Sequence, residues 1–176
     1  MSKANFQTSP LKLYVQDIFR AASTSEKYIY ELFGLTFKNV MIHGVITSLY
    51  NTTTTATNIE LSDATGSVQV YYDSTKSNKY CSPSVFQDLC YSFSEAARLG
   101  NENANIMSAL LDSIPKKPIN FSEGDYLSII GDIFVDDKNV RLISAFEAVK
   151  TSVERDIVWI EELRYLYEKF YLWIKE

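Results

Sequence analysis

Residues 40–50 read VMIHGVITSLY, a run rich in β-branched and apolar side chains with a glycine inside it. Such a run predicts one long strand, and Gly44 within it indicates a bulge or a sharp bend. The polar tract over 51–55 predicts a loop, and the segments 56–61 and 67–73 predict two further strands. The sequence therefore predicts a three-stranded meander whose first strand is bent.

The segment between the second and third strands contains Asp63, Thr65 and Gly66. Side chains of Asp and Thr bond to nearby backbone groups in tight turns, and glycine readily accepts a positive φ. We therefore expect these three residues to shape a turn, with Gly66 free to take a positive φ.

A helical insertion is predicted between the third and fourth strands. Pro83 can begin a helix, and apolar residues recur at helical spacing as far as Ile114, with a break near Gly100. The segments 126–135 and 140–148 predict the fourth and fifth strands. Strands ordered as a meander, then a helix, then a hairpin are typical of the OB-fold. The predicted fold class is mainly β with α: a five-stranded OB-fold barrel with a helical insertion over 83–114 and a C-terminal helix.

The two ends of the chain predict different structures. Residues 1–10 are polar and predict a flexible lead, whereas 11–19 fit either a short extended piece or one helical turn. Residues 153–175 carry apolar side chains on one arc of a helix. We expect a lead-in over 1–27, an OB-fold domain over 28–150 and a partner-binding helix over 151–176.

The apolar surface of that last helix has two explanations, which the sequence leaves open. The helix packs on its own barrel, or part of it binds a partner protein. Further apolar residues outside the main arc, more than one small barrel is expected to cover, favour the partner. These are Ile157, Val158, Tyr165 and Leu172.

Composition excludes several classes of function. The net charge of −5 provides no overall basic field for polyanions. Cys81, Cys90 and the single histidine, His43, lack the spacing of a zinc site, and we expect His43 to be a packed or edge residue. Asp132, Asp136 and Asp137 resemble a metal cluster in sequence, but we expect all three to lie at a solvated hairpin tip. No catalytic constellation is present, so we expect a non-enzymatic protein with no catalytic residues, no cofactor and no metal.

No apolar run reaches the roughly 20 residues of a membrane-spanning helix, and we expect a soluble intracellular protein with no membrane contact.

Several motifs occur in an order similar to that of a known family. They are Lys12-Leu13-Tyr14-Val15-Gln16-Asp17-Ile18-Phe19, Asp63-Ala64-Thr65-Gly66, Glu123-Gly124-Asp125-Tyr126 and Leu166-Tyr167-Glu168-Lys169-Phe170-Tyr171. Their joint order, from residue 11 to about 172, resembles the Stn-one family. This family supplies an OB-fold subunit of the CST telomere-capping complex, is related to the middle subunit of replication protein A, and has a short member in the insect terminin complex.

The resemblance implies a subunit that acts in the nucleus at chromosome ends. It implies heterodimerisation with a small OB-fold protein similar to Ten-one, or its terminin counterpart, together with a larger telomere-capping subunit and single-stranded DNA. A general replication or repair subunit, like the middle subunit of replication protein A, is the alternative. Carried onto this chain, the partner-binding residues are Ile160, Leu163, Tyr167, Phe170, Tyr171 and Ile174.

In OB-folds the ligand usually crosses the second and third strands and their flanking loops. Aromatic side chains there stack on bases, worth about 1 to 3 kcal/mol per base, and basic side chains contact phosphates. Strand alternation directs Tyr72 toward the core and Tyr71 outward. Asp73, Asp136 and Asp137 repel phosphate, so we expect weak binding by the chain alone. The candidate nucleic-acid-binding residues are Tyr50, Tyr71, Lys76, Lys79, Phe134 and Arg141.

Overall fold

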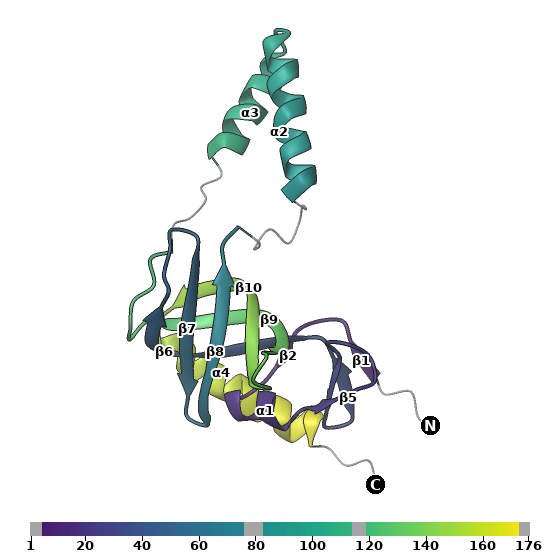
Figure 1. Ribbon diagram of the computed structural model, residues 1–176, viewed down its shortest axis with the longest axis vertical. Coiled ribbons are helices and arrows are strands. Elements are labelled where there is room, and N and C mark those ends of the chain that lie inside the picture. Colours follow the sequence, from purple (N-terminus) through teal and green to yellow (C-terminus); the bar gives the residue numbers. More distant parts are fainter. Residues whose placement is uncertain (1–4, 76–82, 114–118, 173–176) are drawn as a thin grey trace.

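The computed structural model describes residues 5–75, 83–113 and 119–172, and its centre is a β-barrel (Figure 1). The main sheet has the strand order β2-β6-β7-β8-β10-β9, and β6 also pairs with β9, which closes the barrel. The prediction of a meander followed by a helical insertion and a hairpin is confirmed. The five barrel strands are β6 (Asn39–Tyr50), β7 (Ala56–Asp63), β8 (Gly66–Asp73), β9 (Tyr126–Val135) and β10 (Arg141–Thr151).

The barrel interior is filled with aliphatic side chains that alternate along its strands. Tyr72 is buried with them, whereas its neighbour Tyr71 is partly exposed, as strand alternation predicts. The fully or almost fully buried members include Ile42, Ile46, Ile59, Leu61, Val68, Val70, Leu127, Ile129, Ile133 and Ile143.

Gly44 allows two strands to approach closely. A Cβ at this position would overlap the carbonyl oxygen of Ser62 on β7, so only glycine fits without a shift of the backbone. The bulge lies nearby, where the pairing register with β7 shifts between Ile46 and Ser48. The irregularity predicted for this strand is therefore present, and Gly44 contributes the close approach.

The N-terminal segment is part of the folded structure. Its elements are β1 (Asn5–Gln7), β2 (Leu11–Lys12), α1 (Val15–Arg20), β3 (Ala22–Ser23), β4 (Tyr30–Leu32) and β5 (Leu35–Phe37). β1 pairs in parallel with β5 in a small sheet of order β1-β5-β4-β3 beside the barrel (Figure 1). The expectation of a flexible lead is therefore wrong for residues 5–7, because their backbone groups pair with another strand.

Residues 11–20 combine the two structures that the sequence left open. A two-residue strand is followed by a short helix, and both contribute to the barrel core. Leu11, Leu13, Val15 and Ile18 are buried there. The lead-in is thus continuous with the hydrophobic core of the barrel.

The turn between β7 and β8 also binds the start of α1. Asp63 Oδ1 accepts hydrogen bonds from the backbone N–H groups of Thr65 at 2.6 Å and Gly66 at 3.1 Å, as expected for a tight turn. Asp63 Oδ2 accepts a bond from the N–H of Val15 at 2.8 Å, and Thr65 Oγ1 accepts one from Gln16 at 3.1 Å. The turn therefore satisfies two N–H groups that α1 cannot bond internally. Gly66 does not use its freedom to adopt a positive φ, since it is not among the glycines with that backbone conformation.

The predicted insertion is a helical hairpin. It consists of α2 (Pro83–Arg98) and α3 (Glu102–Ser113), which pack on each other and stand away from the barrel (Figure 1). Gly100 has a φ of +87°, and Asn101 Oδ1 accepts a hydrogen bond from the N–H of Ala104 at 3.1 Å. A glycine at positive φ and an Asn cap explain the break between the helices.

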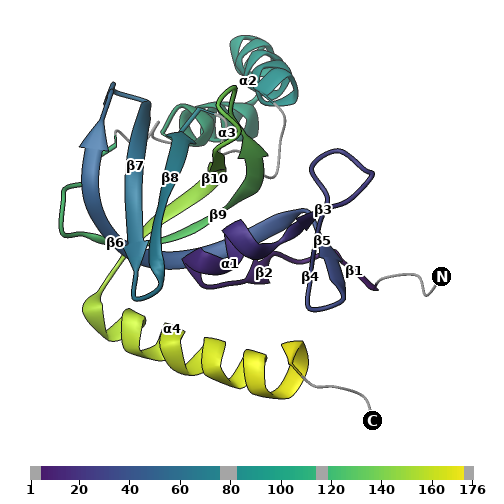
Figure 2. The same ribbon diagram turned by 60° about the horizontal axis from the view of Figure 1, so that its bottom comes forward.

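The C-terminal helix lies across the barrel (Figure 2). It comprises α4 (Val153–Leu166) and a π-helical turn, η1 (Tyr167–Tyr171). Trp159 and Leu163 are its buried residues on the barrel side. Among the helices of the described residues, none is long and apolar enough to cross a membrane.

Replacing Asp63 by alanine removes both the turn bonds and the bond to α1. We expect Asp63→Ala to lower the free energy of unfolding by about 2 kcal/mol or more, since several backbone donors lose their acceptor. Asp136→Ala is the matched control, because Asp136 Oδ1 accepts bonds from Lys138 and Val140 within one hairpin turn. It should cost about 1 kcal/mol. Urea denaturation measures both, and equal losses would show that the contact with α1 contributes nothing.

Candidate nucleic-acid and partner interfaces

The outer face of β6, β7 and β8 brings two of the predicted tyrosines together. Tyr50 pairs with Asn58, and Asn58 pairs with Tyr71. Directly paired residues point to the same face of a sheet. Tyr50 and Tyr71 therefore flank Asn58 on one face, about 10 Å apart at the usual strand spacing. Two partly exposed rings at this separation form a surface on which planar groups can stack.

The rest of this face is polar and acidic. Ser62 Oγ lies 3.3 Å from Thr47 Oγ1 and 2.7 Å from Ser67 Oγ. Burial and the nearby carboxylate of Glu60 raise the pKa of Tyr50. β6, β7 and β8 contain no Lys or Arg. These strands thus offer aromatic rings without positive charge for phosphates.

The other predicted nucleic-acid residues lie outside this cluster. Phe134 pairs with Leu142 on β9 and β10, next to the core pair Ile133 and Ile143, so it points outward. Arg141 donates from Nη1 to the carbonyl oxygen of Ile18 at 2.7 Å, and its guanidinium lies 5.4 Å from the Tyr30 ring centroid. Arg141 thereby holds the lead-in against the barrel, and a phosphate contact by it stays a prediction. Lys76 and Lys79 lie outside the described residues.

The expectation of a solvated hairpin tip is wrong for Asp132, which lies within β9 at the end of a row of paired residues that begins with Tyr50, Asn58 and Tyr71. The row continues from Tyr71 to Ser144 and then to Asp132. Asp132 Oδ1 is buried and has no hydrogen-bond partner, and Lys38 Nζ lies 3.8 Å from Oδ2. Burial raises the pKa of Asp132, so its carboxyl takes up a proton more readily than an exposed aspartate.

The C-terminal helix is fixed to the lead-in by two partly buried tyrosines, Tyr167 and Tyr171. Tyr167 donates its hydroxyl hydrogen to the buried carboxylate of Asp17, and the same oxygen accepts a bond from the N–H of Tyr14 at 3.4 Å. Tyr171 donates to the carbonyl oxygen of Lys12 at 3.2 Å, and burial raises its pKa to about 12. Phe33 stacks on Tyr171 with ring centroids 5.7 Å apart.

A charged triad adds a second attachment. Glu162 accepts a bond from Lys12 Nζ at 2.8 Å and two bonds from Arg155 at 3.0 Å. The hydrogen bond from Arg155 is the main cause that lowers the pKa of Glu162. Nothing in the local sequence signals this triad, since it joins residues 150 positions apart.

The predicted partner-binding residues separate into two groups. Leu163 is buried, and Tyr167 and Tyr171 bond to the lead-in, so these three pack on their own barrel. Ile160 and Phe170 are exposed, by 43% and 60%. Ile174 lies outside the described residues. The four residues predicted to add apolar surface outside the main arc are all exposed: Ile157, Val158, Tyr165 and Leu172.

His43 is buried at the junction of β6, β9 and α4. Its Nδ1 lies 3.0 Å from Ser128 Oγ, and its ring packs between those of Tyr126 and Trp159, with centroids 6.0 and 5.7 Å away. The expectation of a packed histidine is confirmed. Burial lowers the pKa of His43 despite the carboxylate of Asp156, whose Oδ1 lies 3.5 Å from Nε2.

A cavity of about 210 Å³ opens beside this histidine. It lies between α4, the β7–β8 turn and the start of α1, and it was not predicted from the sequence. Its walls include the aromatic residues Tyr14, Tyr126 and Trp159 and the carboxylates of Asp63 and Asp156.

Comparison with known proteins identifies the fold. The chain matches no protein-family model and no curated protein sequence. It does match a chain of the crystal structure of the S. pombe Stn1–Ten1 complex, with a TM-score of 0.53, 16% identity, and coverage of 95% of this chain and 93% of that chain. The barrel is an OB-fold.

Two further solved structures share this OB-fold. A chain of the yeast Stn1 and Ten1 crystal structure matches with a TM-score of 0.52, 12% identity, and coverage of 96% of this chain and 78% of that chain. A chain of a replication protein A heterotrimer bound to single-stranded DNA matches with a TM-score of 0.54, 10% identity, and coverage of 88% and 90%. The likeness extends well beyond the barrel strands, since it spans most of each chain.

Removing the Tyr167 hydroxyl leaves the carboxylate of Asp17 with one donor fewer. We expect Tyr167→Phe to lower the free energy of unfolding by about 1–3 kcal/mol, because Asp17 is fully buried. Tyr165→Phe is the control on the exposed side of the same helix, and it should change stability by less than about 0.5 kcal/mol. Thermal unfolding measures both, and an equal effect of the two changes would contradict the role of the buried bond.

The single histidine makes a pH prediction simple to read. We expect NMR titration of the His43 ring to give a pKa below 6.5, the ordinary value, because burial disfavours the charged form. The unfolded chain then binds the proton more tightly than the folded one. The neutral His43 ring therefore makes its full contribution to the free energy of unfolding above pH 6.5. This contribution is lost as the pH falls through the pKa of His43 in the folded protein. In His43→Gln this component of the pH dependence should be absent, and an unshifted titration would contradict the prediction.

Proposed function

We propose that this protein is a non-enzymatic telomere-capping subunit that acts in the nucleus at chromosome ends. In this proposal it pairs through α4 with a small OB-fold protein similar to Ten1, or its terminin counterpart, and works with a larger capping subunit. Together they protect the single-stranded DNA of the chromosome end. The chain alone holds that DNA weakly.

The observation that carries the proposal is the uncovered side of α4. Val153, Ile157 and Ile160 recur at intervals of four and three residues, so they lie along one line of the helix, and all three are exposed. Apolar residues at this spacing are the usual anchors of a helix that packs into a groove of another protein. The adjoining side of α4 is held on the barrel by the buried residues Trp159 and Leu163, so the exposed line is presented on a fixed helix.

Fold likeness supports the same partner class. The matched S. pombe and yeast structures are complexes of Stn1 with Ten1, and the likeness to the S. pombe chain spans nearly all of both chains. The order of motifs from residue 11 to about 172 independently resembles the Stn-one family. Neither argument depends on the exposure of α4, and all three favour a heterodimer.

The nucleic-acid part of the proposal rests on the tyrosine row. Tyr50 and Tyr71 provide two rings for stacked bases, and Phe134 provides a third on β9. Glu60 lies among them, and Asp73 follows at the end of β8. Affinity for single strands depends strongly on neutralised phosphates, so this surface requires a partner that supplies cations.

A general replication or repair subunit is the second candidate. The matched replication protein A heterotrimer, which is bound to single-stranded DNA, has a similar TM-score and supports it. Fluorescent tagging of the protein in cells separates the two candidates. Foci at chromosome ends are expected for a capping subunit, and general chromatin association for a replication subunit.

The proposed interface predicts the effect of one substitution. Ile157 is 64% exposed, so Ile157→Glu should leave the fold intact and abolish co-purification of the small OB-fold partner from native extract, identified by mass spectrometry. A carboxylate in an apolar interface loses its hydration without gaining a partner. Circular dichroism checks the fold of each variant.

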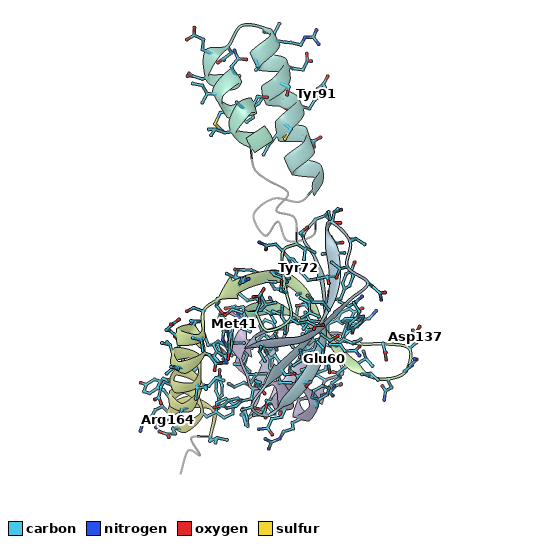
Figure 3. The ribbon with its side chains drawn as sticks, turned by 90° about the vertical axis from the view of Figure 1, so that its left-hand side faces the viewer. Met41, Glu60, Tyr72, Tyr91, Asp137 and Arg164 are labelled. Carbon is cyan, nitrogen blue, oxygen red and sulfur yellow. The ribbon has the colours of Figure 1, made fainter. Side chains whose placement is uncertain are left out.

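The matched control is Val140→Glu, since Val140 is a 44% exposed apolar residue in the turn after β9. This turn contains Asp137, which lies on the opposite side of the barrel from Arg164 of α4 (Figure 3). Val140→Glu should keep the partner, and loss of the partner from both variants, or from neither, would contradict docking through α4.

Fluorescence anisotropy with labelled single strands at low salt should show tight binding only after the partner is added.

A further inference from the structure

The cavity beside His43 is built from segments that are distant in sequence. Tyr14 comes from the lead-in, His43 from β6, Tyr126 from β9, and Asp156 and Trp159 from α4. Its volume of about 210 Å³ corresponds to about seven water molecules at their share of liquid volume. A space of this size suits one side chain or a small organic ion better than a drug-sized molecule.

His43 Nε2 and Asp156 Oδ1 both belong to lining residues of this cavity, and both are acceptors when the proton of the neutral His43 ring is on Nδ1. His43 Nε2 has almost no solvent exposure and no hydrogen-bond partner, and it lies 3.5 Å from Asp156 Oδ1. Burial lowers the pKa of His43 and keeps the ring neutral. When Nδ1–H donates to Ser128 Oγ at 3.0 Å, the lone pair of Nε2 is directed to the cavity as an acceptor.

The nearest cations are already paired elsewhere. Lys12 and Arg155 both bond to Glu162, and neither lines the cavity. Asp63, the other carboxylate of the wall, uses both oxygens for backbone N–H groups of the β7–β8 turn and of α1. Asp156 is therefore the carboxylate available to a ligand, and the described lining residues include no Lys or Arg.

The remaining walls suit the apolar part of an organic cation. Tyr14 and Tyr126 contribute aromatic rings, whose faces attract ammonium and guanidinium groups, whereas the Trp159 ring already has Lys12 Nζ 5.4 Å from its centroid. Ile160 lines the cavity and is also exposed on the outer side of α4, so the cavity is reached from the surface next to that helix. Two acceptors within 3.5 Å of each other can receive two N–H bonds from one such group.

We propose that this cavity is a binding site for an organic cation, a primary ammonium or guanidinium group that donates to His43 Nε2 and Asp156 and packs against Tyr14 and Tyr126. The group belongs either to a free amine or to a side chain of a bound protein. The site stands on the cavity itself and does not require the function proposed above.

Titration of the full chain with n-butylammonium and with propylguanidinium tests the site. The NMR signal of the His43 ring reports binding without ambiguity, since the chain has one histidine. We expect saturable shifts with either cation. The neutral analogue 1-pentanol should bind at least about tenfold more weakly, because it cannot pair with a carboxylate.

Two variants with the same change in charge show where the cation binds. Asp156→Asn should weaken n-butylammonium binding at least about tenfold, since the ion pair is lost while the shape of the side chain is kept. Glu161→Gln also removes one carboxylate from α4, but Glu161 pairs with Arg164 at 2.9 Å and lies outside the cavity. It should bind as the unchanged chain does. Equal affinity for 1-pentanol, equal effects of the two substitutions, or no saturable shift would each overturn the proposal.

Addition of the co-purified partner distinguishes the two sources of the cation. If a side chain of the partner occupies the cavity, the n-butylammonium response disappears in the complex and returns when the partner is removed. A response that persists in the complex assigns the site to a free amine. Because the titration of the chain alone needs no partner, failure of the heterodimer and failure of this site are separate results.

Discussion

The buried carboxylate of Asp17 connects the two ends of the chain. It receives the hydroxyl hydrogen of Tyr167 and a bond from Arg20 at 3.1 Å, although it has no solvent exposure. A buried carboxylate without hydrogen-bond donors costs free energy, so the bond from Tyr167 to Asp17 favours packing of η1 against the lead-in. Two residues before Asp17, the N–H of Val15 at the start of α1 donates to Asp63 of the β7–β8 turn. The lead-in is thus held between the barrel and the C-terminal helix, and the position of α4 depends on both contacts.

This attachment decides which side of α4 is available to other molecules. Leu163 and Tyr167 face inward, and Glu162 is occupied by Lys12 and Arg155. Ile157 is therefore exposed on the outer side of α4, and Ile160 lies between that side and the cavity at His43. The same placement forms this cavity, because α4 provides one of its walls. An exposed apolar line and an open cavity beside it thus follow from one docking geometry.

The strands that usually bind nucleic acid in OB-folds have an uneven composition here. They carry aromatic rings and hydroxyl groups, and Glu60 is the charged residue in the middle of the face. Stacking is available on such a surface, whereas neutralisation of phosphate is not. The proposed complex would therefore need its positive charge from an associated subunit, with this chain contributing shape and stacking.

The sequence by itself determined the order of the strands, the break of the insertion at Gly100, the inward direction of Tyr72 and the surplus apolar residues of the last helix. These features depend on periods of 2 and 3.6 residues and on the conformational limits of glycine, which act over a few neighbouring positions. Only the tertiary structure decided that Tyr167 bonds to Asp17, that Asp63 caps α1, and that His43 and Asp156 share a cavity. Each of these joins residues far apart in the chain, and their proximity arises only when the closed barrel brings the lead-in and the C-terminal helix to the same side.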